Sequence, residues 1–268
     1  MSKANTEFTL ITGASSGIGA AYADRMAKRG SNLILVARNV ERLNFLANKL
    51  RKERGVNVEV ISTDLTNESD ISRIEKILST DKRITMLINN AGVGAVSKLI
   101  ESDVNKMKEM INLNVLALTR LTYAAVPAFV EKGKGTIINI SSIAAINPEA
   151  LNGVYGGTKA FVLALTNSLH YELADAGLRV QAVLPGVIAT EFWETAGMPV
   201  ANLPKDIVMT TDNLVDASLR GLDLGEIITI PSLPDKNEWD HFEKAREKMR
   251  PMLSRTVPAA RYGEFTNI

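Results

Sequence analysis

The sequence predicts an α/β fold: a Rossmann-type, doubly wound parallel sheet of about seven strands with helices on both faces, folded as a single domain. Three observations predict it. Short apolar strands alternate with amphipathic helical stretches from residue 8 to about residue 230, a pattern typical of parallel sheets with right-handed crossovers. The first strand runs straight into a glycine-rich turn. At 268 residues and 46% hydrophobic content, the chain can bury one core of this kind.

The individual elements follow from short β-branched runs and from apolar periodicity. Strands are expected at residues 8–12, 32–37, 58–63, 86–90, 135–140, 179–184 and 226–230. Helices are expected at residues 20–29, 41–54, 67–79, 102–131, 155–174 and 211–222. Residues 1–230 therefore form the predicted dinucleotide-binding domain.

Two segments fall outside this alternation. Residues 191–210 set apolar side chains in loop-like company, which fits either a substrate lid or an ordinary packed loop. Residues 231–268 form a C-terminal extension with a charged helical stretch at 237–250. Its role is open between an interface, an extension of the lid and disorder.

Composition excludes several classes of function. With 31 basic and 30 acidic residues, nothing indicates a nucleic-acid or anionic membrane surface. The lack of cysteine excludes disulfides and thiolate metal sites, and His170 and His241 alone argue against a zinc site, so no metal is expected. The polar first seven residues, and the lack of an apolar run near the ~18 to 20 residues that cross a bilayer, predict a cytoplasmic protein.

The turn after the first strand is suited to a diphosphate. It places glycines at Gly13, Gly17 and Gly19, between a strand and a helix, where backbone N–H groups face a positive helix end. The spacing lacks the Gly-Lys-Ser/Thr ending of a P-loop, which argues against a nucleotide hydrolase. The expected cofactor contacts of this turn are Gly13, Ser15, Ser16, Gly17, Ile18 and Gly19.

The end of the second strand indicates which dinucleotide is bound. In such folds a carboxylate here contacts both ribose hydroxyls, whereas an arginine pairs with a 2′-phosphate. This chain carries Ala37 and then Arg38, which favours NADP(H) over NAD(H). Arg42 lies one helical turn later and could share the role. The alternative is that Arg38 is a solvated loop residue.

Later strand ends supply further candidates. Asp64, followed by Leu65, either accepts from the adenine amino group or caps the helix that begins near Asn67. Asn90 can tie the turn Asn90-Ala91-Gly92 to a neighbouring strand. After the sixth strand, the Thr190 hydroxyl could bond to a carboxamide.

Tyr155 and Lys159 are the candidates for chemistry. Their spacing of four places both side chains on one helix face, and a nearby ammonium is expected to lower the phenol pKa by roughly two to three units. Such a phenol can act as an acid and a base. Ser141 and Ser142 end the preceding strand, at the edge of the sheet where ligands bind.

Together these motifs resemble the short-chain dehydrogenase/reductase family. The resemblance spans residues 8 to about 230 and rests on motifs that occur in the family's order: Thr12-Gly13-x-x-x-Gly17-x-Gly19, Asn89-Asn90-Ala91-Gly92, Asn114, Ser142, Tyr155-x-x-x-Lys159 and Pro185-Gly186-x-x-x-Thr190. Ser142 is preferred to Ser141 because the family's usual interval before the tyrosine is thirteen residues.

The resemblance implies a hydride transfer between nicotinamide and a carbonyl carbon. Tyr155 donates the proton, Ser142 bonds the same oxygen, Lys159 lowers the Tyr155 pKa and binds the nicotinamide ribose, and Asn114 positions a water that relays protons to Lys159. Cofactor contacts implied by it are Asp64 and Leu65 at adenine, Asn90, Ala91 and Gly92 at ribose, and Pro185, Gly186, Ile188 and Thr190 at nicotinamide. Arg38 matches the NADP-selecting position, and a homo-oligomer, tetramer or dimer, is expected.

The expected function is an NADPH-dependent carbonyl reductase or alcohol dehydrogenase for a small-molecule ketone or secondary alcohol. Val187, Phe192 and Trp193 near the site favour an apolar ketone. Two alternatives are a 3-oxoacyl-thioester reductase, which should want basic residues around its pocket, and an NADPH-binding protein without chemistry. Gly156 and Gly157 depart from the family pattern, and each is expected to loosen the helix by about 0.5 to 1 kcal/mol.

Overall fold

The structure is a computed structural model, and it describes residues 6–263, except for the side chain of residue 150. The chain divides into two compact units, Met1–Pro231 and Ser232–Ile268. The first unit carries all the predicted site residues.

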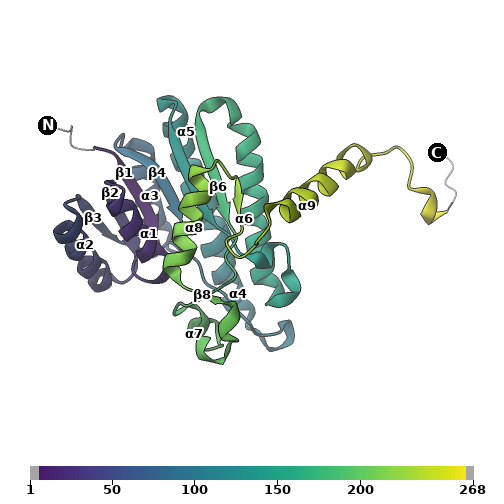
Figure 1. Cartoon of the computed structure of the whole chain (residues 1–268), viewed down its shortest axis with the longest axis horizontal. Coiled ribbons are helices and arrows are strands. Elements are labelled where there is room, and N and C mark those ends of the chain that lie inside the picture. The colour runs from purple at the N-terminus through teal and green to yellow at the C-terminus, as the bar shows by residue number, and fades with distance from the viewer. Residues whose placement is uncertain (1–5, 264–268) are drawn as a thin grey trace. The chain divides into compact units, whose positions relative to one another are not determined.

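Seven parallel strands form the main sheet of the first unit (Figure 1). They are β1 Phe8–Thr12, β2 Asn32–Ala37, β3 Val58–Ser62, β4 Ile84–Asn89, β5 Gly135–Ile140, β6 Leu178–Val183 and β9 Ile228–Thr229. Their order is β3-β2-β1-β4-β5-β6-β9, and the strand order reverses between the neighbouring strands β1 and β4. The predicted doubly wound fold is confirmed.

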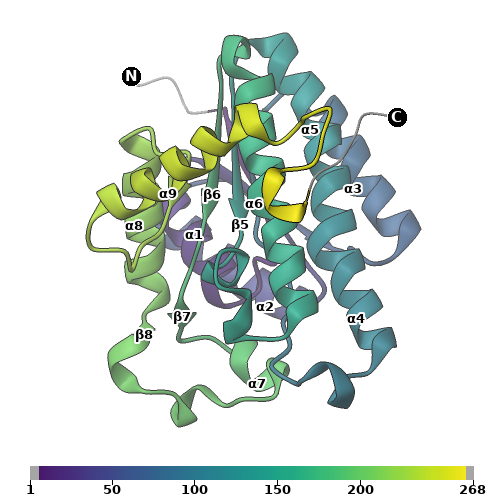
Figure 2. The same cartoon turned by 90° about the vertical axis from the view of Figure 1, so that its right-hand side faces the viewer.

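Helices cover both faces of this sheet, because each buries one apolar stripe. They are α1 Gly17–Lys28, α2 Val40–Arg54, α3 Glu68–Thr80, α5 Leu118–Lys132, α6 Gly153–Glu172 and α8 Thr211–Asp223. The first unit also has the shorter helices α4 Val104–Ile111 and α7 Phe192–Ala196. Figure 2 shows these helices from a second side. One core cluster joins α1, α2 and α8 through Tyr22, Leu43 and Leu214, and another joins α3, α5 and α6 through Ile74, Leu121 and Leu169.

The helix expected at residues 102–131 is not uniform. Asn112–Ala117 is a π-helical segment between α4 and α5, and it contains Asn114. Extra-residue segments of this type are frequent at functional sites. Taken as one helix, Val104–Lys132 is long and apolar enough to cross a bilayer, judged by length and composition alone. The expectation that no apolar run is long enough to do so is therefore wrong. Its buried face includes Leu121 and Phe129 of the core, which accounts for much of this apolar character.

The segment at residues 191–210 is more ordered than a loop. It holds α7, two 3-10 turns and the short strand β8 Val208–Met209, which pairs in parallel with β7 Val187–Ile188. In the second unit, α9 Lys236–Met249 stacks the rings of Trp239 and Phe242 at 5.1 Å.

Candidate active site

A cavity of about 820 Å³ opens at the carboxyl ends of the parallel strands, where open α/β sheets bind ligands. Residues that follow β1, β2, β3, β4, β5 and β6 all line it. The cavity brings together every predicted site residue except Gly19 and Asn114.

The glycine turn is held close to the turn after β4. Asn90 Nδ2 donates to Thr12 O at 2.9 Å, as expected for a residue that ties this turn to a neighbouring strand. Gly13 has φ +65°, and a Cβ there would lie 2.8 Å from Asn90 Nδ2. Gly19 is needed for packing instead of cavity contact, because its Cβ would meet Gly13 O at 2.3 Å.

The first turn of α1 keeps its amide donors available. Its N-cap residue Ser16 makes no side-chain bond to the helix, and the turn holds no acidic residue. By contrast, Asn39 and Asn67 cap α2 and α3 by accepting from first-turn amides. An uncapped helix end beside a glycine turn is a fitting site for the diphosphate of a dinucleotide.

The adenosine end of the cavity carries both predicted arginines. Arg38 is exposed on the cavity wall and makes no ion pair with any residue from 6 to 263. Arg42 also lines the cavity, but its Nη1 lies 2.6 Å from Glu191 Oε2. Ala37 is buried and leaves no carboxylate at the ribose position.

Asp64 lines the cavity without capping a helix. Its Oδ1 accepts from the Thr66 amide and hydroxyl at 3.0 and 2.7 Å, and these bonds, with a smaller effect from Arg38, hold the pKa of its carboxyl below the usual value. Asn67 caps α3 instead, so the capping alternative for Asp64 is wrong.

Tyr155 and Lys159 lie in the first two turns of α6, and both line the cavity together with Ser142. Asn152 begins this helix by accepting from the amides of residues 154 and 155. Ser142 Oγ accepts from Ala144 N at 3.1 Å and lies near enough to the Tyr155 hydroxyl to affect its pKa, and Lys159 Nζ donates to Ile140 O at 2.9 Å. Ser141 is turned to another use, because its hydroxyl donates to the main-chain oxygen of Lys159.

The acid–base properties differ from the sequence prediction. Burial raises the pKa of Tyr155 to about 12, against a smaller opposite effect of the Ser142 hydrogen bond. Burial lowers the pKa of Lys159 to about 8. The expected lowering of the Tyr155 pKa by Lys159 is wrong in this structure, since Lys159 Nζ is bound to Ile140 and lies 5.8 Å from the phenol ring centroid. Both groups are therefore mainly protonated at neutral pH.

Asn114 lies behind the cavity wall. Its Oδ1 accepts from Val93 N at 2.9 Å, and its Nδ2 donates to Val93 O at 2.8 Å and Thr158 Oγ1 at 3.1 Å. A Cβ on Gly92 would lie 3.1 Å from Asn114 Oδ1 and 3.5 Å from Lys159 Nζ. Asn114 thus borders Lys159 but fixes the turn after β4 through its own amide.

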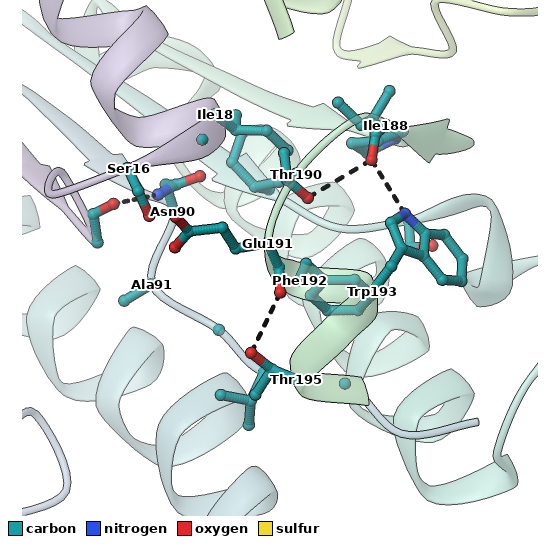
Figure 3. Close-up of a pocket in the computed structure, with 18 of the residues that line it drawn as sticks. Ser16, Ile18, Asn90, Ala91, Ile188, Thr190, Glu191, Phe192, Trp193 and Thr195 are labelled. Atoms are coloured by element: carbon teal, nitrogen blue, oxygen red, sulfur yellow. Dashed lines mark hydrogen bonds between the residues drawn. The ribbon is translucent and has the colours of Figure 1, made fainter. Parts of the chain in front are cut away.

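The far end of the cavity is aromatic and apolar. Phe192 lies 5.8 Å from the Tyr155 ring, centroid to centroid, and Trp193 Nε1 donates to Ile188 O at 3.0 Å (Figure 3). Thr190 Oγ1 donates to Ile188 O at 3.4 Å. Val187 lines the same wall.

Several cavity residues could not be recognised from motifs. Gly94, Leu151 and Glu191 are examples. Gly94 had a signal in its spacing two residues after Gly92. Leu151 and Glu191 had none, because their position depends on how the loops fold over the sheet.

Comparison with known proteins identifies the class of this site. The sequence model of the family described as short chain dehydrogenase matches residues 7–199. The very-long-chain 3-oxoacyl-CoA reductase of Mus musculus is 35% identical over 190 residues, which make up 69% of this chain and 60% of that protein.

Two solved structures are similar to this chain over nearly its whole length. A short-chain dehydrogenase from Sphingobium yanoikuyae in complex with NADPH is 46% identical, with a TM-score of 0.92 over 96% of this chain and 100% of that one. The bulky-bulky ketone specific alcohol dehydrogenase from Comamonas testosteroni is 40% identical, with a TM-score of 0.89 over 97% and 100%. The protein is an oxidoreductase that binds NADP(H). It belongs to the short-chain dehydrogenase family.

Proposed function

We propose that this enzyme is an NADPH-dependent carbonyl reductase that interconverts a bulky, uncharged, apolar ketone and its secondary alcohol. The observation that carries the proposal is that the neighbouring side chains of Ser142 and Tyr155 both line one cavity, between its cofactor side and its apolar end. One carbonyl oxygen can contact both hydroxyls there.

The protein side of the reaction follows from these groups. NADPH, when bound, supplies the hydride. The Tyr155 hydroxyl protonates the carbonyl oxygen as charge develops, and the Ser142 hydroxyl stabilises that charge by a hydrogen bond. Lys159, anchored on Ile140 O, keeps a positive charge beside the phenolate that remains and has two further N–H groups for the nicotinamide ribose. Asn114 acts as a positioning residue through Val93 and Thr158.

At neutral pH the Tyr155 phenol is in the form that can donate a proton. A Tyr155 pKa raised to about 12 keeps the phenol protonated, which is the form that a ketone reduction needs. Alcohol oxidation needs the phenolate and should speed up as the pH rises.

The lining of the cavity supports an uncharged substrate with bulk on both sides of the carbonyl. Beyond Tyr155 the walls are apolar, and they include Leu151, Phe192, Met198, Leu203 and Ile207. Among the described residues the cations on the cavity wall are Arg38, Arg42 and Lys159, all on the cofactor side. The Comamonas testosteroni enzyme, whose name specifies bulky-bulky ketones, shares 40% of its sequence with this chain.

A 3-oxoacyl-thioester reductase is the second candidate, favoured by the 35% identity to the mouse 3-oxoacyl-CoA reductase. Its substrate carries phosphates on the carrier. Lys205 of the lid is exposed and does not line the cavity, so those phosphates have no evident partner.

The test measures turnover of a panel of substrates by the loss of NADPH absorbance. We expect kcat/KM for ketones with two bulky apolar substituents to exceed that for acetone and for a 3-oxoacyl-CoA by at least about 100-fold. A higher kcat/KM for the thioester would favour the second candidate. No turnover of any carbonyl, with NADPH still bound, would favour a non-catalytic NADPH-binding protein.

The NADP preference has its own test in Arg38. The Arg38 guanidinium makes no ion pair within residues 6–263 and can pair with a 2′-phosphate, so Arg38→Ala should raise the KM for NADPH about tenfold or more and leave the KM for NADH within about twofold. Equal effects on both would return Arg38 to the solvated-loop alternative.

A homo-oligomer is proposed from the exposed apolar side chains of α5 and α6. Tyr123 and Tyr171 are 70% and 62% exposed, and Phe161 is 39% exposed. Large exposed apolar side chains on a soluble protein often mark a surface that contacts another molecule. Light scattering of the purified chain distinguishes a monomer from a dimer or tetramer.

A further inference from the structure

Glu191 holds one of the two arginines at the adenosine end of the cavity. The pair between Arg42 in the first turn of α2 and Glu191 at the start of α7 joins residues 149 positions apart. In Figure 3 the Glu191 side chain extends toward the side of the cavity marked by Ser16 and Ala91, whereas Phe192 and Trp193 lie on the opposite side of the chain. Neighbouring residues thus face the two ends of the cavity.

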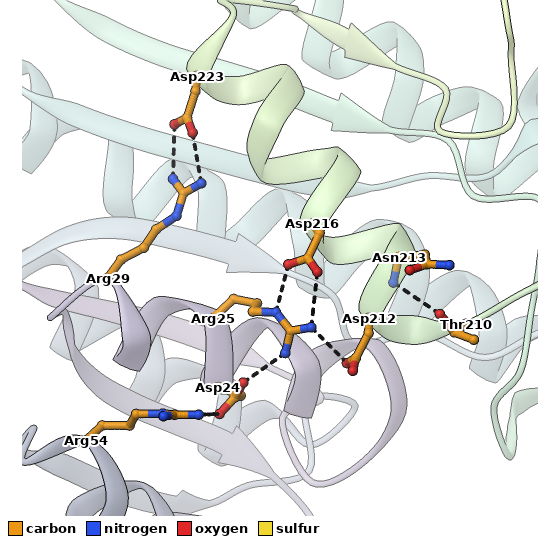
Figure 4. A network of polar contacts seen from close by, with 9 residues as sticks. All are labelled: Asp24, Arg25, Arg29, Arg54, Thr210, Asp212, Asn213, Asp216 and Asp223. Carbon is orange, nitrogen blue, oxygen red and sulfur yellow. Dashed lines mark hydrogen bonds and ion pairs between the residues drawn. The ribbon is translucent and has the colours of Figure 1, made fainter.

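This pair is easily exchanged, unlike the arginine pairs that join α1 and α8. Arg25 is 19% exposed and contacts Asp24, Asp212 and Asp216 together, and Arg29 binds Asp223 with two hydrogen bonds (Figure 4). In contrast, Arg42 and Glu191 have half or more of their side chains exposed and make one contact, at 2.6 Å. Single exposed pairs of this kind are weak.

A 2′-phosphate is a stronger partner for Arg42 than a carboxylate. It carries close to two negative charges near neutral pH and can bind a guanidinium through two oxygens. Arg38 beside it makes no ion pair among the described residues, so two guanidinium groups can converge on one phosphate. Glu191 would then lose Arg42 as its partner and would lie close to the phosphate, which is also negatively charged.

Release of Glu191 would be felt at Tyr155. The next residue, Phe192, packs against the Tyr155 ring and lies so close to Gly94 that a Cβ there would be 2.1 Å from its Cζ. Among the described residues, the other hydrogen bonds from α7 to neighbouring segments run from Trp193 Nε1 to Ile188 O and from Val96 N to Ala196 O. The Arg42 pair is therefore the ionic tie between the lid and the cofactor side.

We propose that Glu191 is a specificity-determining residue that competes with the 2′-phosphate of NADP(H) for Arg42. Binding of NADP(H) moves Arg42 from Glu191 to the phosphate and frees the start of α7, including Phe192. NAD(H), which lacks that phosphate, leaves the pair intact. The preference for NADP(H) and the opening of the ketone end are thereby linked.

The first test measures affinity without turnover. Isothermal titration calorimetry of the full chain with adenosine 2′,5′-bisphosphate and with ADP compares wild type, Glu191→Gln and the control Glu194→Gln. Glu194 is an exposed acid of the same short helix that makes no ion pair among the described residues. We expect Glu191→Gln to bind the bisphosphate about three- to tenfold more tightly and ADP within about twofold of wild type. Glu194→Gln should match wild type for both ligands.

A double-mutant cycle identifies the route of the effect. Arg42→Gln should weaken bisphosphate binding about tenfold, and Glu191→Gln should add no gain in that background. Unchanged or weaker bisphosphate binding in Glu191→Gln, equal gains in Glu191→Gln and Glu194→Gln, or a full gain without Arg42 would each overturn the proposal.

The second test observes the lid. The sequence has two tryptophans, so Trp239→Phe leaves Trp193 as the only fluorophore of its kind. The bisphosphate should shift Trp193 emission in that protein, and ADP should not. Adding Glu191→Gln should produce the shifted spectrum before any ligand is added. An identical response to both nucleotides would contradict the link between phosphate and lid.

Discussion

Two sets of buried polar side chains lie between the sheet and its helices, and they use their hydrogen bonds in opposite ways. In the first set, Asn89 Nδ2 donates to Asn139 Oδ1 and Thr122 Oγ1, while Asn139 Nδ2 donates to Thr166 Oγ1. Each threonine hydroxyl then donates to its own helix. The amides of this set donate to side chains within it, its hydroxyls donate to helix carbonyls, and one acceptor, Asn89 Oδ1, has no hydrogen-bond partner.

The second set is formed by Ser142, Tyr155 and Lys159, each at most 6% exposed. The two hydroxyls are neighbours that both line the cavity, and Lys159 Nζ uses one of its three hydrogens in its bond to Ile140 O. This set lines the cavity and keeps donors for a ligand, whereas the first set does not line it. Burial alone therefore does not mark a functional group; unspent donors at a cavity do.

The largest expected effect is on turnover, from breaking the second set. Tyr155→Phe removes the proton donor and should lower kcat by about 10³-fold or more, with the Kd for NADPH within about twofold. Tyr171→Phe, an exposed tyrosine of the same helix, is the matched control and should keep wild-type turnover. Stopped-flow and fluorescence titration measure the two quantities, and substantial activity in Tyr155→Phe would remove its role as acid.

The next effect is the pH dependence of stability that Lys159 imposes. Burial lowers its pKa from 10.5 to about 8, so its folded form favours the neutral amine. The contribution of Lys159 to the free energy of unfolding is fully present above about pH 10.5 and is lost as the pH falls through 8. At pH 7 the loss is about 3 kcal/mol. The unfolding free energy of Lys159→Met relative to wild type should therefore fall by about 2 kcal/mol between pH 7 and pH 9.5.

Urea unfolding at a series of pH values checks this difference. Lys98→Met is the control, because Lys98 precedes an exposed turn outside the cavity. A pH-independent difference between Lys159→Met and wild type would mean that the ammonium is not desolvated.

Breaking the first set should cost stability and spare chemistry. Thr166→Val keeps the side-chain volume but leaves Asn139 Nδ2 with an unpaired hydrogen, which should lower the unfolding free energy by about 1 to 2 kcal/mol. Turnover per folded molecule should match wild type. Calorimetric unfolding and active-site titration separate the two effects, and a loss of kcat without a loss of stability would erase the distinction between the sets.

The smallest effect concerns the helix turn that carries the second set. A Cβ at Gly157 would meet nothing within 4 Å, so Gly157→Ala should stabilise the protein by about 0.5 to 1 kcal/mol. At Gly156 the same Cβ would lie 3.1 Å from Pro148 Cβ and 3.3 Å from Ala144 O, so Gly156→Ala should gain less or lose stability. Chemical denaturation compares the pair; equal gains would show that the neighbours of Gly156 yield easily.

The fold was predictable because each strand and helix has a local signal. Strand β2 occupies the expected residues 32–37, and all seven expected strands are in the main sheet. The candidate site was predictable as far as motifs sit at strand ends. Residues from Gly13 to Thr190 reach one cavity because parallel strands end at one edge.

What sequence could not predict depends on contacts between distant segments. The π segment around Asn114 and the bonds of Asn114 to Val93 need the packed turn after β4. The direction of the Tyr155 pKa shift depends on burial, which exceeds any effect of Lys159. The position of Glu191 opposite Arg42 depends on the path of residues 191–210.

The parallel pair of β7 and β8 has a consequence for how this enzyme can diversify. Register pairs Val187 with Val208 and Ile188 with Met209, and Ala189 N donates to Met209 O, so the chain between them leaves and returns at one point. A loop closed at its base can change length or sequence at small entropic cost to the rest of the fold. New substrate preferences can therefore arise between residues 195 and 207 while the sheet and the cofactor side of the cavity stay as they are.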